Sequence, residues 1–84
     1  MRSVLFTFSP QVSRERQEAL LAQIGTWQGV KKVARLKPDA QHPEIWRMCY
    51  ADIEDDADIE AMVERLAALP EVESAASPAE RHLL

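Results

Sequence analysis

The chain has few of the residues on which small disulfide-bonded or metal-binding domains depend. Its 84 residues include one cysteine, two histidines and two glycines. A single cysteine, Cys49, excludes an internal disulfide and a metal site built on paired cysteines. His42 and His82 have no partner at metal-ligand spacing, so each is expected in a loop or tail. The sequence therefore predicts no metal site and no cofactor.

Long hydrophobic runs are also missing. Near the N-terminus the only apolar stretch is Val4 to Phe8. This stretch is shorter than the roughly 7–15 apolar residues of a secretory signal and the roughly 20 that span a bilayer. We therefore expect a cytoplasmic protein that has no membrane partner.

Positive charge is in deficit, with a formal net charge of −4. This balance argues against a nucleic-acid partner, because such binding depends on neutralising phosphates. The acidic residues cluster between Asp52 and Glu60, and a basic run precedes them: Lys31, Lys32, Arg35 and Lys37. We interpret the basic run as a solvated strand edge and the acidic run as a helix N-terminus.

The size and composition favour one small globular domain. The chain is 46% hydrophobic and 29% charged, which is an ordinary balance for a folded domain. A domain of this length buries only a modest core, which leaves little room for a deep active-site cavity. Binding through a surface is the expectation.

No residue pattern predicts catalysis. Neither Gly25 nor Gly29 belongs to a phosphate-binding glycine run, and no serine has a recognisable base nearby in the sequence. Cys49 stands within an apolar stretch, where a buried and unreactive thiol is expected. We therefore predict that the protein is not an enzyme and has no catalytic residues.

Hydrophobic periodicity predicts six elements. Period-two alternation indicates strands, and recurrence every three or four residues indicates helices. In chain order these are a strand over 2–8, a helix between Val12 and Trp27, strands over 30–36 and 45–53, a helix between Ile59 and Leu69, and a strand over 72–76. The order predicts an α+β, ferredoxin-like βαββαβ sandwich, with four antiparallel strands and two helices on one face. Right-handed crossovers put the first and third strands in its centre.

The turns and caps carry further predictions. Ser9 or Ser13 is expected to cap the first helix and Asp55 or Asp56 the second. Gly25 suits a left-handed helix end. The imperfect alternation of the strand over 30–36 predicts a bulge or an edge position.

The third predicted strand is apolar on both faces. Trp46, Met48 and Tyr50 lie on one face, and the other holds these four residues: Ile45, Cys49, Ala51 and Ile53. In the predicted fold one of these sets must lie on the sheet face that no helix covers. An apolar open face on a small domain indicates docking of a partner or of a second copy. The sequence leaves open which set is exposed.

Two segments resemble the propeptide domains of subtilisin-like serine proteases and the related I9-type inhibitors. They are WQGVKKV at 27–33, which leads into the second strand, and LAALPEVESA at 66–75, which joins the second helix to the last strand. The resemblance covers nearly the whole chain in order. It implies a ferredoxin-like domain over residues 1–76 and an exposed C-terminal tail over 77–84.

The resemblance also implies a mechanism. The open sheet face, with Trp46, Met48 and Tyr50, docks on two surface helices of the protease, and the tail enters the substrate groove. The tail residues concerned are Arg81, His82, Leu83 and Leu84, with Leu84 in the primary specificity pocket. Such a domain inhibits the protease or assists its folding.

Two other functions stay open. The open sheet face can pair two copies of the chain, which makes a homodimeric regulatory module. The other hypothesis is a dimeric ferredoxin-like enzyme with a pocket between the helices and the sheet. The two terminal leucines can also fold back on the domain or form a frayed end.

Overall fold

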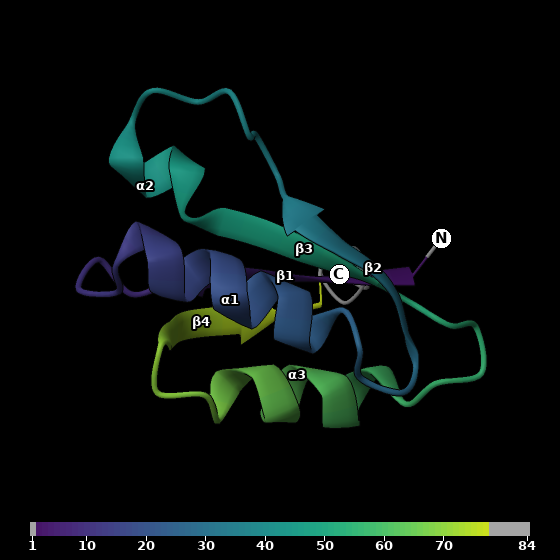
Figure 1. The fold of residues 1–84 in the computed structure, drawn as a ribbon. Coiled ribbons are helices and arrows are strands. Elements are labelled where there is room, and N and C mark those ends of the chain that lie inside the picture. Colours follow the sequence, from purple (N-terminus) through teal and green to yellow (C-terminus); the bar gives the residue numbers. More distant parts are fainter. Residues whose placement is uncertain (1, 78–84) are drawn as a thin grey trace, which may run out of the picture.

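The computed structural model describes residues 2–77, and it has the predicted ferredoxin-like α+β architecture with one additional helix (Figure 1). The elements, in chain order, are β1 (Arg2–Phe8), α1 (Arg14–Ile24), β2 (Val30–Arg35), α2 (Pro43–Trp46), β3 (Met48–Ile53), α3 (Ile59–Ala67) and β4 (Val72–Ala76). The extra element is α2, which lies in the connection between the two βαβ halves.

The four strands form one antiparallel sheet in the order β2-β3-β1-β4. The first and third strands are therefore central, as predicted. β2 is an edge strand, which confirms the prediction of a bulge or an edge position, and its register with β3 also shifts between Val30 and Lys32.

Helices α1 and α3 cover the same face of the sheet, because side chains from both join one core with alternate residues of β1 and β3. The members of that core are Val4, Phe6, Phe8, Leu20, Leu21, Ile24, Cys49, Ala51, Ile53, Met62, Leu66 and Val72. The rings of Phe6 and Phe8 meet edge to face, with centroids 5.6 Å apart, a favourable geometry for aromatic pairs.

Side-chain caps begin the two long helices. Ser13 caps α1, accepting a hydrogen bond from the Arg16 backbone N–H at 3.1 Å, and this is one of the two predicted caps. Asp58, and neither Asp55 nor Asp56, caps α3 by accepting from the Ala61 N–H at 3.1 Å. The predicted cap at Asp55 or Asp56 is wrong because these residues lie in a turn that precedes the helix. In this turn the Ala57 N–H donates to the Glu54 carbonyl at 3.1 Å.

Of the two glycines, the one with a left-handed backbone is not the one predicted. Gly25 follows α1 with a right-handed φ of −62°, so the predicted left-handed helix end is wrong. Gly29 instead has a φ of +92°, in the region that favours glycine. It opens the approach to β2 and lies close to Ala57.

Strand β3 begins at Met48, three residues later than predicted. His42 accepts a hydrogen bond at Nδ1 from the Glu44 N–H at 3.3 Å, and Pro43 occupies the first turn of α2. Proline suits this position because its fixed φ is helical and its missing N–H is not needed there. Local helical signals therefore override the apolar pattern that extended the strand back to Ile45.

Candidate partner-binding surface

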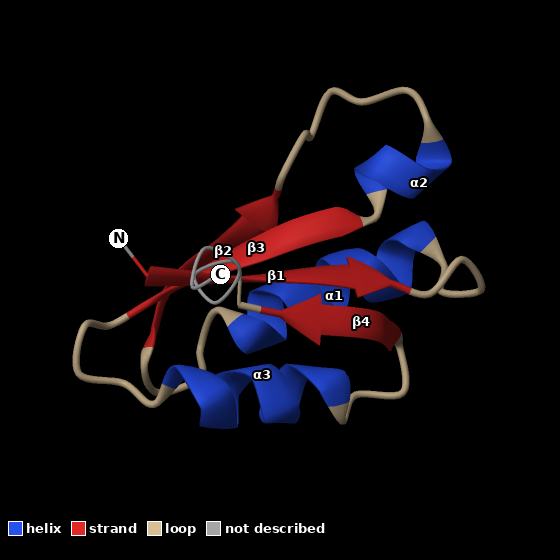
Figure 2. Ribbon diagram, turned by 180° about the vertical axis from the view of Figure 1, so that it is seen from behind, coloured by secondary structure: helices blue, strands red, loops and turns tan. Residues whose placement is uncertain are grey.

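The face of the sheet away from α1 and α3 presents one set of alternating residues. Cross-strand partners share a face, and the register places Leu5 opposite both Tyr50 and Ala76, and Thr7 opposite both Met48 and Ser74. The side chains of Leu5, Met48 and Tyr50 are half-buried. In Figure 2 the strands lie in front of α1. We name this surface the open face.

The structure decides which side of β3 is exposed. Cys49, Ala51 and Ile53 are 1%, 0% and 1% exposed and belong to the core, whereas Met48 and Tyr50 lie on the open face. Leu36 also lies on the open face, because its N–H donates to the Met48 carbonyl at 2.9 Å and so places it beside Met48. Its side chain is 41% exposed. The open face thus has an apolar centre with Tyr50 in it.

Trp46 does not belong to that surface. It lies in α2, with the guanidinium of Arg35 over its ring at 3.3 Å and that of Arg14 at 4.7 Å. It borders a depression of about 530 Å³ that α1 residues Arg14 and Leu21 also line. The prediction that Trp46 shares a strand face with Met48 and Tyr50 is therefore wrong, because one helical turn interrupts the period-two alternation.

Arg35 is a structural residue that the sequence interpretation missed. It is 7% exposed, so it does not belong to a solvated strand edge as predicted. Its guanidinium donates to Gln17 Oε1 and the Trp46 carbonyl, each at 3.0 Å, and to Glu18 Oε2 at 2.8 Å. A buried guanidinium needs such partners to offset the loss of hydration. Arg35 therefore joins β2, α1 and α2, and no signal in the sequence distinguishes it from the neighbouring lysines.

The predicted tail residues Arg81, His82, Leu83 and Leu84 lie outside the described residues. The last element before them, β4, ends at Ala76 beside Leu5, and Ser77 follows it. The last described strand is therefore an edge strand that adjoins the open face.

Cys49 is buried, as the sequence indicates. Burial raises the pKa of its thiol to about 11, because the apolar surroundings disfavour the charged thiolate. A thiol that stays protonated is a poor nucleophile. Cys49 is therefore a packing residue of the core.

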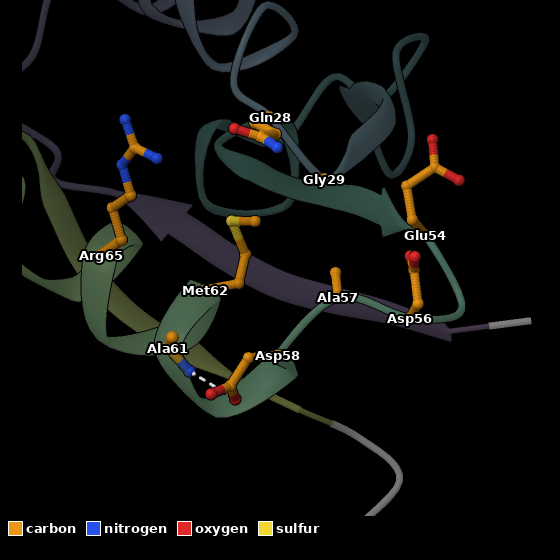
Figure 3. Close-up of a pocket in the computed structure, with 9 residues that line it drawn as sticks. All are labelled: Gln28, Gly29, Glu54, Asp56, Ala57, Asp58, Ala61, Met62 and Arg65. Carbon is orange, nitrogen blue, oxygen red and sulfur yellow. Dashed lines mark hydrogen bonds between the residues drawn. The ribbon is translucent and has the colours of Figure 1, made fainter.

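Another depression lies between α3 and the approach to β2 (Figure 3) and has a volume of about 630 Å³. Met62 and Ala57 lie between an acidic side, with Glu54 and Asp56, and the side that carries Arg65. Asp58 is already engaged in capping α3. Among residues 2–77 no group of histidine, cysteine, aspartate and glutamate side chains could hold a metal ion.

Within the same described range, none of the helices has the length and apolar character needed to cross a membrane. Compared with protein-family models, with curated proteins and with solved structures, the chain matches none. The resemblance to subtilisin propeptides therefore stays a prediction.

Proposed function

We propose that this protein binds a subtilisin-like serine protease and inhibits it or assists its folding. The open face docks on the protease surface, and residues Arg81–Leu84 occupy the substrate groove. In this proposal the protein is not an enzyme. It acts in the cytoplasm, where a reduced thiol such as that of Cys49 persists.

One observation carries the proposal: an apolar open face lies beside the strand from which the chain leaves the sheet. Leu5 contributes to that face and pairs with Ala76, the last residue of β4. In this proposal a partner that contacts the open face also receives the segment that follows Ser77. An extended segment gains affinity from backbone pairing and from pockets that hold alternate side chains.

The size of the open face favours two joined contacts over one. Its 4 strands, with 6 residues in β3, span roughly 20 Å by 19 Å, or about 400 Å² in projection, at standard strand spacings. A stable interface takes about 800 Å² from each partner. The face alone therefore supports a weak contact, and a second contact through the tail raises affinity by increasing the effective concentration.

The test is a titration of the intact protein into a subtilisin-type protease that cleaves a chromogenic peptide. We expect competitive inhibition, and a variant without Arg81–Leu84 should inhibit about a hundredfold less strongly or worse. Circular dichroism of both proteins checks that the truncated variant keeps its fold. Absence of inhibition of several such enzymes by the folded intact protein would contradict the proposal.

Self-association through the open face is the second candidate, since the same apolar centre of Leu5, Met48 and Tyr50 can pair with its own copy. Sedimentation at increasing concentration separates the two functions. A dimer held by the open face should persist without Arg81–Leu84, whereas protease inhibition should not. A monomer at all concentrations, combined with inhibition that depends on the tail, supports the protease partner.

A further inference from the structure

A second surface lies along the outer edge of β4, where α3 and the strand form a groove of about 450 Å³. Its walls are Glu60, Val63 and Glu64 of α3, and Ala75, Ala76 and Ser77 at the end of the strand. Residues 60, 63 and 64 share one side of the helix because they are three and four positions apart. This groove is separate from the open face, since α3 forms one wall.

The edge of β4 is free within the described part of the chain. β4 pairs with β1 on one side, and no other strand of residues 2–77 pairs with its outer side. The opposite edge strand, β2, carries Lys31, Lys32 and a bulge, which are features that discourage pairing with another strand. β4 ends instead in two alanines, whose small side chains let another backbone approach.

The groove is acidic, and no basic residue of the described part of the chain is paired with Glu60 or Glu64. Glu60 and Glu64 are exposed like charges at i and i+4, an arrangement that is unfavourable in an isolated helix. Ion pairs between described residues use the carboxylates of Glu18, Glu71 and Glu73 instead. A cationic side chain placed in the groove would relieve the repulsion.

The hydroxyl of Ser77 is the second sign of an occupant. Ser77 lines the groove, is 7% exposed, and its Oγ has no hydrogen-bond partner among the described residues. A buried hydroxyl without a partner costs free energy. It is therefore a ready donor or acceptor for the backbone of a chain laid beside β4.

We propose that this groove binds an extended segment of a partner protein that carries lysine or arginine. The segment adds a strand to the free edge of β4, and its cationic side chain lies between Glu60 and Glu64. Strand addition of this kind takes its affinity from backbone hydrogen bonds and its specificity from side-chain contacts. The proposal does not depend on the protease, so either one can fail alone.

The test is an amide NMR titration of the full chain with a blocked hexapeptide in which threonine and lysine alternate. We expect shifts that concentrate at Ala75, Ala76 and Ser77, and roughly fivefold weaker binding for the double variant Glu60→Gln/Glu64→Gln. The matched control, Glu15→Gln/Glu44→Gln, changes the net charge equally at exposed sites elsewhere. Equal binding by the two double variants, or equal binding of a peptide with glutamate in place of lysine, overturns the proposal.

Ser77→Ala separates a binding role from a structural one. Loss of an unpaired buried hydroxyl should raise the melting temperature while it weakens peptide binding. A lower melting temperature overturns the proposal, because the hydroxyl is then satisfied within the domain.

The chain's own basic residues supply the remaining alternative. If Arg81→Gln/His82→Gln shifts the amides of Ala75–Ser77 as much as the peptide does, without any peptide, the groove is covered by its own chain and the proposal fails.

Discussion

The two faces of the sheet are built from neighbouring residues of the same strands, yet they differ in burial. On β1, Phe6 is 1% exposed beneath the helices, while Leu5 beside it lies half-buried on the open face. On β3 the same contrast separates Cys49 from Tyr50. One face packs against the helices and forms the core, whereas the apolar residues of the other face remain available for the partner that we propose.

Substitution of the neighbouring residues Phe6 and Leu5 on β1 should give the largest difference in stability between the two faces. Phe6→Ala removes a fully buried ring that packs against Phe8, which should cost about 3–5 kcal/mol. Leu5→Ala should cost only about 1 kcal/mol, because part of the side chain is already in water. Urea unfolding of both variants measures the difference, and similar costs would show that the open face is not open in solution.

A smaller contrast separates two basic residues of β2. Arg35→Met removes hydrogen bonds to Gln17, Glu18 and the Trp46 carbonyl, which should cost roughly 2–3 kcal/mol. Lys32→Met, at an exposed position opposite Asp52, should stay within about 0.5 kcal/mol of the parent. Denaturation of the pair tests whether burial, rather than charge, sets the effect.

The strands that carry these substitutions also show how much of the fold the sequence could predict. Period-two alternation predicted β1 with its observed bounds, and the short segment after Pro70 was correctly predicted as β4. Helical spacing predicted α3, which ends at Ala67, two residues before the predicted Leu69. The pattern was ambiguous for β3, since both sides are apolar and only the position of the helices decides which is buried. Arg35 could not be singled out, because it is buried by contacts with residues that are distant in the sequence. No local sequence pattern indicates those contacts.

Gly25 and Gly29 allow a further comparison, because only Gly29 has a positive φ. Gly29→Ala should cost about 1–2 kcal/mol, because φ is +92° and the new methyl would lie 3.3 Å from the Ala57 Cβ. At Gly25 the φ of −62° suits alanine, and the main cost is a 3.3 Å approach to a Val33 methyl. We expect Gly25→Ala to be near neutral, so the two unfolding midpoints should separate clearly. A neutral Gly29→Ala would contradict the role of its backbone conformation.

The smallest expected effect lies at the ion pair between Arg16 of α1 and Glu71, the residue that precedes β4. Hydrogen bonds from the Arg16 guanidinium lower the pKa of Glu71 below its ordinary value of 4.5. The folded state therefore gains stability above the ordinary pKa and loses it as the pH falls through the lowered value. Glu71→Gln should lose less stability than the parent between neutral pH and about pH 3, as measured by thermal unfolding. Parallel losses in both proteins would contradict this assignment.

The most direct test of the divided sheet compares stability and inhibition in one variant. Tyr50→Lys places a charge in the centre of the open face, with Gln23→Lys on the exposed side of α1 as the matched control. We predict that Tyr50→Lys unfolds within about 1 kcal/mol of the parent and inhibits a subtilisin-type protease at least about tenfold less, while the control inhibits normally. Undiminished inhibition by a folded Tyr50→Lys variant would contradict the claim that the open face is the binding surface.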